Sequence, residues 1–250
     1  MSKKIMRYSI LRYTPVKAAG EFINLGVLFV DENEGRLQFS YIKKMKRLAA
    51  FDDELDINGV RRLLKSINND ANEKMDERDF VLDEFIQYYL NGFVFSKPKN
   101  IVYDDFSEMV KMLEKTFLRF DYEKHERLSK ESEQKIFRQL CKAQKVKIKS
   151  GYETKGQFDE KVKYDFATND YYIKIFDYSE RKNLSYAINS AKLWAWNACH
   201  ADKKLIIIYR YDEQNYTTNN EFVSIMKIFE SANVQTFDVL QMDEVISMVS

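Results

Sequence analysis

One segment near the N-terminus constrains the fold more than any other part of the chain. Two strand-like apolar runs, residues 5–13 and 22–30, flank a short connection that contains Pro15 and Gly20. Apolar runs of this length, bounded by proline and glycine, are typical of β-strands joined by a turn or loop. The segment therefore predicts two strands of a small antiparallel sheet.

The same segment contains candidate binding residues. Arg12 and Glu21 lie near one end of the two expected strands, Asn24 adds a hydrogen-bonding amide, and Gly26 permits a close approach of the backbone. These residues form either a ligand site or a buried structural ion pair with an amide capping the loop. The residue types favour the structural pair, and in both cases Arg12 and Glu21 depend on each other.

The run from Arg12 to Pro15 followed by the run from Gly20 to Val27 resembles the signature of a bacterial family, domain-of-unknown-function family 3037. The resemblance implies no agreed activity. It implies a setting in toxin–antitoxin, stress or phage-defence biology, because members of the family are often encoded beside HipA-like kinases. A protein partner, a HipA-like kinase or a defence component, is therefore expected.

The rest of the N-terminal half predicts helices added to this sheet. A polar turn at residues 31–35 leads into a third strand at residues 36–42, and helical spacing of apolar residues follows. The helical stretches are residues 43–71, 80–90 and 105–120. The charge-rich stretch 121–130 is the best candidate boundary, which predicts an α+β domain over residues 1–120 and a second domain over residues 129–250.

The second domain is predicted to form a mixed sheet flanked by helices. The expected elements are a helix at 129–143, strands at 145–149, 162–167 and 171–178, a helix at 184–198 and a strand at 205–209. This αβββαβ order, followed by one more helix and strand, is similar to a degenerate PD-(D/E)xK nuclease-like fold. The whole chain is thus expected to be α+β.

The resemblance to such nucleases implies where a metal site would lie. Carboxylates on the second and third core strands would hold a divalent cation, with a lysine nearby. Asp165 and Lys174 take two of these positions, but Tyr172 stands where the second carboxylate is needed. Asp170 is the acid that could replace it. We therefore expect no catalysis, metal or other cofactor, and keep a Mg²⁺-dependent nuclease as the alternative.

Lysines provide two further local patterns. Lys145, Lys147 and Lys149 alternate along an expected strand and so share one face, while residues 43–47 form a basic cluster at the start of an expected helix. Alternating lysines can follow a phosphate backbone or protect a sheet edge from aggregation. With 40 basic and 39 acidic residues, the net charge of +1 favours edge protection over nucleic-acid binding.

Two tryptophans lie in the expected helix 184–198. Because successive side chains of a helix point in different directions, one of Trp194 and Trp196 can enter the core while the other lies at its margin. The tryptophan at the margin, with Phe176 and Tyr178, would form a partner-binding surface, since aromatic side chains concentrate binding energy.

Cysteine usage and hydropathy indicate the compartment. Cys141 and Cys199 are far apart and form no CxxC pattern, which is typical of free thiols in a reducing cytoplasm. No apolar run approaches the length of a membrane span. The sequence therefore favours a non-catalytic cytoplasmic binding or regulatory protein that acts through a protein partner.

Overall fold

The computed structural model describes residues 4–15, 20–74, 80–88, 92–178, 184–211 and 220–250. The chain divides into two compact units, unit 1 from Met1 to Leu128 and unit 2 from Ser129 to Ser250. Unit 1 contains an antiparallel sheet and unit 2 a mixed sheet, each accompanied by helices. The predicted α+β class is therefore confirmed.

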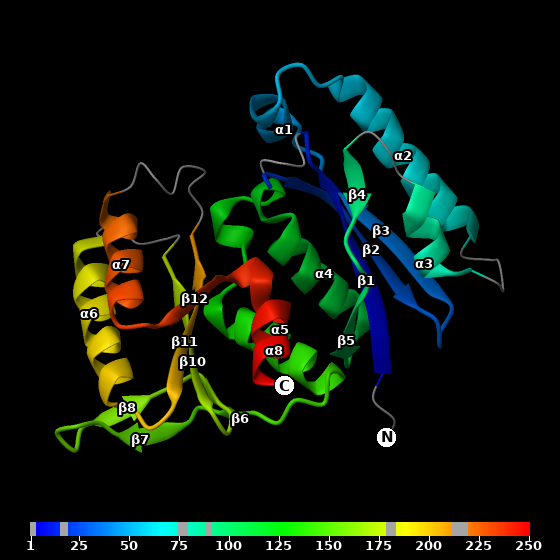
Figure 1. Ribbon diagram of the computed structural model, residues 1–250. Helices are drawn as coiled ribbons and strands as arrows, with labels where there is room; N and C mark the ends of the chain where they lie inside the picture. Colours follow the sequence, from blue (N-terminus) through cyan, green and yellow to red (C-terminus); the bar gives the residue numbers. More distant parts are fainter. Residues whose placement is uncertain (1–3, 16–19, 75–79, 89–91, 179–183, 212–219) are drawn as a thin grey trace. The chain divides into compact units, whose positions relative to one another are not determined.

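The sheet of unit 1 is built around its first strand. Its strands are β1 (Lys4–Tyr13), β2 (Ile23–Asp31), β3 (Arg36–Tyr41), β4 (Phe93–Phe95) and β5 (Lys99–Tyr103). They follow the order β3-β2-β1-β4, and β5 also pairs with β1 (Figure 1). The strands predicted at 5–13, 22–30 and 36–42 are formed to within two residues at each end.

The close approach predicted at Gly26 is present in β2. Gly26 pairs with Leu11 on one side and with Tyr41 on the other. A Cβ atom at this position would lie 2.5 Å from Cζ of Phe39. The register between β1 and β2 shifts just beyond Leu11, where Arg12 pairs with Asn24 and Leu25 is left out of the pairing. Glycine is thus required here by packing.

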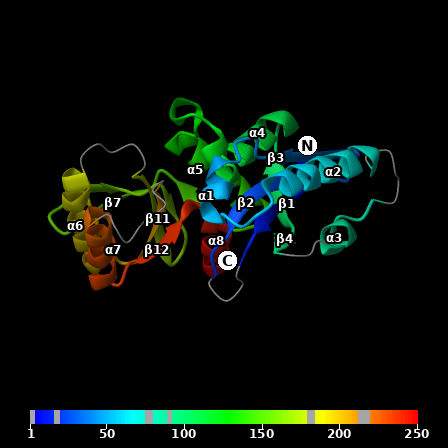
Figure 2. The same ribbon diagram turned by 90° about the horizontal axis from the view of Figure 1, so that it is seen from above.

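The helices of unit 1 follow the apolar periodicity, with one interruption. They are α1 (Lys46–Phe51), α2 (Ile57–Lys74), α3 (Leu82–Phe85), η2 (Ile86–Tyr88), α4 (Phe106–Phe117), η3 (Arg119–Asp121) and η4 (Lys124–Glu126). The stretch 43–71 therefore forms two helices, because the acidic segment 52–56 interrupts it. α2 packs on β3 and α4 packs on β2, whose residues are buried almost throughout (Figure 2).

Unit 2 has a five-stranded mixed sheet with the order β12-β11-β10-β9-β6. β10, β11 and β12 run parallel, and β9 and β6 are antiparallel. The strands are β6 (Lys149–Ser150), β7 (Glu153–Lys155), β8 (Lys161–Lys163), β9 (Phe166–Ala167), β10 (Tyr171–Asp177), β11 (Lys204–Arg210) and β12 (Gln235–Asp238). The helices are α5 (Lys130–Ala143), α6 (Leu184–His200), α7 (Asn220–Ser231), η6 (Val239–Gln241) and α8 (Met242–Val249).

Two predicted strands of unit 2 need correction. The strand expected at 145–149 is wrong, because Lys145 has a φ of 61° and Val146 N donates to Cys141 O, which is how α5 ends. Only Lys149 of the three alternating lysines lies in a strand, so they do not share a strand face. The strand expected at 162–167 divides into β8, which pairs with β7 as a separate hairpin, and β9.

Within the described residues, no helix has the length and apolar character needed to cross a membrane.

Candidate functional site

Arg12 and Glu21 do not form the expected ion pair. The guanidinium of Arg12 lies over the ring of Phe22, 4.3 Å from its centroid. Glu21 is exposed, and among the described residues it makes no hydrogen bond or ion pair with Arg12. The ladder between β1 and β2 ends at Tyr13 and Ile23, so the sheet does not hold Glu21 beside Arg12.

Asn24 instead joins the sheet to the end of α4. Its Nδ2 donates a hydrogen bond to the carbonyl oxygen of Phe117 at 3.1 Å. Carbonyl groups in the last turn of a helix have no partner within the helix, so this contact satisfies one of them. Oδ1 of Asn24 is buried and accepts no hydrogen bond from the described residues.

A pocket with a volume of about 530 Å³ lies beside Asn24 in unit 1. Three segments line it, the start of β2, the chain from the end of β3 into α1, and the end of α4 with η3. The lining residues are Ile23, Asn24, Ile42, Lys44, Met45, Lys46, Arg47, Leu48, Phe117, Leu118, Phe120 and Asp121. Sequence reasoning missed this pocket, although it had singled out two of its parts, Asn24 and the basic cluster at residues 43–47.

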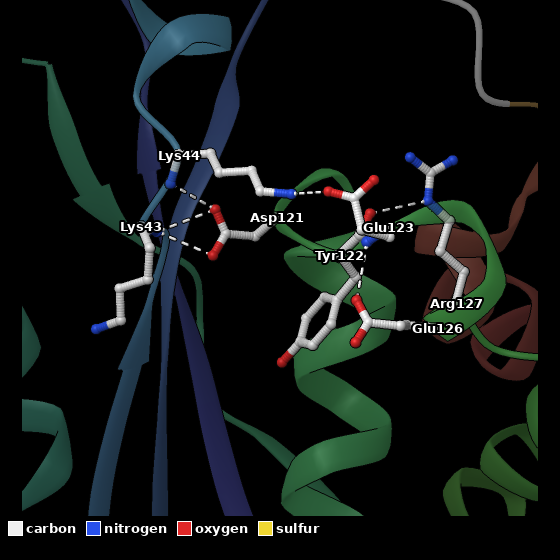
Figure 3. A network of polar contacts seen from close by, with 7 residues as sticks. All are labelled: Lys43, Lys44, Asp121, Tyr122, Glu123, Glu126 and Arg127. Atoms are coloured by element: carbon white, nitrogen blue, oxygen red, sulfur yellow. Dashed lines mark hydrogen bonds and ion pairs between the residues drawn. The ribbon is translucent and has the colours of Figure 1, made fainter.

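Polar contacts connect two of these segments (Figure 3). The carboxylate of Asp121 accepts from the backbone N–H of Lys43 at 2.9 and 3.0 Å and from that of Lys44 at 2.7 Å. Nζ of Lys44 donates to Oε1 of Glu123 at 2.5 Å. This hydrogen bond raises the pKa of Lys44 and lowers the pKa of Glu123. The chain after β3 is therefore held to the chain after α4.

In unit 2 the structure brings Asp165 and Lys174 together. Nζ of Lys174 lies 3.7 Å from Oδ1 of Asp165. The carboxylate has further partners, since Oδ2 accepts from Ile175 N at 2.7 Å and lies 3.0 Å from Nζ of Lys130. Oδ1 accepts from Nε2 of Gln134 at 2.9 Å. Asp165 is thus surrounded by hydrogen-bond donors and two lysines.

Lys174 is mostly buried in this cluster. Its Nζ donates to the carbonyl oxygen of Lys163 at 2.8 Å and lies 4.8 Å from the ring centroid of Trp194. Burial is the largest influence and lowers the pKa of Lys174 below its ordinary value, although Asp165 acts in the opposite direction. A lysine with a lowered pKa can exchange a proton more easily than an exposed one.

The second carboxylate of a nuclease-like site is not near Asp165. Tyr172, at the corresponding position, is buried and donates from its hydroxyl to Oδ1 of Asp202 at 2.8 Å. Asp170 is exposed before the start of β10, and at about 3.3 Å per residue it lies roughly 13 Å along the strand from Lys174. Within the described ranges, no three Asp, Glu, His or Cys side chains are grouped to hold a metal ion.

The two tryptophans of α6 have different environments. Trp194 is half-buried and meets the rings of Tyr164 and Phe176 edge-on, at centroid distances of 5.5 and 6.0 Å. Trp196 is exposed and stacks parallel to Phe158 of the β7–β8 hairpin, with centroids 6.5 Å apart and an interplanar angle of 3°. Phe176 is buried, as is Tyr178, so neither contributes to the surface expected around the exposed tryptophan.

The outer face of α6 exposes large apolar side chains among polar residues such as Asn189 and Lys192. Ala187, Ala191 and Ala195 face the core of unit 2. The opposite side exposes Tyr186, Leu193 and Trp196, beside Phe158. These four make up half of the eight large hydrophobic side chains that are exposed in the described part of the chain. We call them the α6 surface.

Residues 8–117 match the model of a family described as "Protein of unknown function (DUF3037)". The match lies within unit 1 and includes Asn24, the basic cluster and Phe117. No curated protein and no solved structure matches the chain.

Proposed function

We propose that this chain, similar over residues 8–117 to a family of unknown function, is a non-catalytic binding protein that acts through a protein partner. The observation that carries the proposal is the α6 surface. A helix on the outside of a globular protein normally turns polar residues to the solvent. On α6 three large apolar side chains are exposed and one of them, Trp196, stacks on Phe158, and exposed apolar side chains gathered on one face mark interaction sites.

The composition of α6 supports this interpretation. Lys192 is the one Asp, Glu, Lys or Arg residue between Leu184 and His200, whereas charged residues make up 32% of the chain. The exposed fractions of Tyr186, Leu193 and Trp196 are 74%, 57% and 46%. A surface with so little charge is suited to an apolar partner surface, since charged residues are depleted from the centre of protein interfaces.

The spacing of these residues indicates the form of the partner. Tyr186, Leu193 and Trp196 are seven and three residues apart, which places them in one stripe along the helix. A stripe of this kind packs against the apolar face of another helix. The occupant is therefore a helix of a partner protein, with Trp196 and the neighbouring Phe158 as aromatic anchors.

The Asp165 cluster supports a non-catalytic role. Both carboxylate oxygens already interact with Gln134, the backbone N–H of Ile175 and two lysines, and a divalent cation would have to replace these contacts. The cytoplasmic setting rests on the cysteine usage, a HipA-like kinase or a defence component as the partner rests on the family resemblance, and both form part of the proposal.

A metal-dependent nuclease or nucleic-acid-binding protein is the second candidate. One observation favours it, namely that the neighbouring positions of Asp165 and Lys174 combine an acid with a lysine of lowered pKa. The purified chain is expected to leave DNA and RNA intact with Mg²⁺ or Mn²⁺. Cleavage that disappears in both Asp165→Ala and Lys174→Ala would replace the first proposal with this one.

Partner capture tests the first proposal. Tagged chain is used to purify its partner from the native host, and the purified partner is then titrated with the wild type and with the Leu193→Ala/Trp196→Ala variant. Loss of one aromatic anchor together with Leu193 should cost about 2 kcal/mol or more, so the affinity should fall at least about thirty-fold. The control is Val81→Ala in unit 1, because Val81 is also 46% exposed. Equal affinity of all three proteins would refute a role for the α6 surface.

A further inference from the structure

We propose that the pocket of unit 1 binds a small amphiphilic anion, a molecule with an apolar body, one carboxylate and one hydrogen-bond donor. The proposal goes beyond the partner surface on α6, because it concerns unit 1 alone and a ligand of a different class. It rests on the shape of the pocket, on its charges and on the unsatisfied acceptor of Asn24.

The size and walls of the pocket define the body of the ligand. A volume of about 530 Å³ is typical of sites for small molecules. Ile23, Met45, Leu48, Phe117 and Leu118 provide apolar walls. Apolar walls with a few polar groups are the usual arrangement of such sites, in which the walls bind the body of the ligand and the polar groups orient it.

The charges that line the pocket indicate the sign of the ligand's charge. Among the described residues that line it, three are cationic, Lys44, Lys46 and Arg47, and one is acidic, Asp121. Asp121 is already satisfied by the backbone N–H groups of Lys43 and Lys44 (Figure 3). The excess of positive charge therefore favours an anion.

Lys46 is the cation best placed to meet the ligand's carboxylate. Lys44 is engaged with Glu123, and the guanidinium of Arg47 lies 3.7 Å from the ring centroid of Phe120. Lys46 is exposed, and its Nζ has no hydrogen-bond or ion-pair partner in the described ranges of the chain. A carboxylate can pair with Lys46 without breaking an existing contact.

The unsatisfied acceptor of Asn24 indicates that the ligand carries a hydrogen-bond donor. Its Nδ2 must face Phe117 O, because a carbonyl oxygen can only accept, and this orientation leaves Oδ1 as a buried acceptor. Buried polar groups are normally satisfied, so an acceptor of this kind beside a pocket favours a ligand with an N–H or O–H group. An acylated amino acid combines the apolar chain, the amide N–H and the carboxylate.

Matched probes separate the three features. Isothermal titration calorimetry of the full chain would use N-decanoylglycine below its micellar concentration, its methyl ester, which lacks the charge, and N-decanoylsarcosine, which lacks the N–H. N-decanoylglycine should bind. The affinity of the ester should be at least tenfold lower than that of N-decanoylglycine, and the affinity of the sarcosine derivative should be several-fold lower. Equal affinity for all three, or no binding of any, would overturn the proposal.

Variants assign the probe to the pocket. Lys46→Glu should weaken N-decanoylglycine at least tenfold and leave the ester unchanged, whereas Lys65→Glu, an exposed lysine on α2, should change neither affinity. Asn24→Ala should remove the difference between the glycine and sarcosine probes. Should Asn24→Ala fail to fold, the sarcosine probe still tests the donor in the wild type. Undiminished binding by Lys46→Glu would place the probe elsewhere and refute the assignment.

Discussion

Two of the ion pairs described in unit 2 are buried, whereas the ion pairs described in unit 1 remain in solvent. The side chains of Arg210 and Glu133 form an ion pair at 2% and 1% exposure, and those of Lys174 and Asp165 at 14% and 10%. In the six ion pairs described within unit 1, every side chain is at least 28% exposed. Exposed pairs contribute little to stability, but removing one partner of a buried pair is costly.

In the described part of unit 1, two buried or half-buried aspartates accept hydrogen bonds from tyrosine hydroxyls rather than pairing with a basic side chain. The hydroxyl of Tyr103 donates to Asp31, which is buried, and the hydroxyl of Tyr13 donates to Asp52 at 2.5 Å. A phenol satisfies a carboxylate without a second charge that would also need to leave water. We therefore expect charge removal to affect unit 2 far more than unit 1.

The largest expected effect is at Glu133. Glu133→Ala removes from the core of unit 2 the carboxylate that pairs with the buried guanidinium of Arg210, so the free energy of unfolding of unit 2 should fall by about 3–5 kcal/mol. Urea denaturation followed by circular dichroism measures this loss. The matched control, Glu123→Ala, removes the acid of the exposed pair with Lys44 and should leave the transition midpoint unchanged. Equal shifts of the urea midpoint in the two variants would contradict the proposed difference between buried and exposed ion pairs.

A smaller loss is expected at Asp165. Asp165→Ala removes the acceptor for Ile175 N and Gln134, which should cost about 2–3 kcal/mol in the same assay. The loss is limited because Nζ of Lys174 keeps its hydrogen bond to the carbonyl oxygen of Lys163. Asp165→Asn retains part of the hydrogen bonding and should fall between the wild type and Asp165→Ala. An Asp165→Ala variant that is more stable than the wild type would show that the contacts around Asp165 destabilise unit 2.

The Tyr13 hydroxyl should make unit 1 sensitive to high pH. Burial, followed by the hydrogen bond to Asp52, raises the pKa of Tyr13 from 10.0 to about 12. The unfolded chain releases this proton near pH 10 and the folded chain does not. The contribution of the phenol is therefore complete below pH 10 and is lost as the pH rises to 12. Tyr13→Phe should show a shallower decline of stability over this interval, measured against the wild type, and parallel curves would contradict the assignment.

The smallest effect concerns thiol accessibility and leaves stability unchanged. Cys199 is exposed, whereas Cys141 is buried, and burial raises the pKa of its thiol to about 12. A thiol reagent at pH 8 should label one cysteine in the native chain and both in urea, and Cys199→Ser should abolish native labelling. Because both cysteines lie in unit 2, labelling of Cys141 in increasing urea reports when this unit opens. Rapid native labelling of both would contradict the burial of Cys141.

Residue patterns within single elements were sufficient to predict most of the fold. Apolar runs bounded by turn residues predicted the strands β1 to β3, and helical spacing of apolar residues predicted α4. These elements depend on neighbours close in sequence, so their residue patterns identify them. The strand expected at residues 145–149 was wrong, because the left-handed Lys145 continues the end of a helix and alternating lysines carry no information about this backbone conformation.

The candidate sites could not be predicted in the same way. The sequence by itself determined the α+β class, the strands of the first sheet and the residues similar to the family. Only the tertiary structure decided that Asn24, Lys46 and Phe117 line one pocket, that Glu133 meets Arg210, and that Trp196 lies outside while Trp194 packs on Phe176. Each of these contacts joins residues from separate elements, and their proximity depends on how sheets and helices pack rather than on a local pattern of residues.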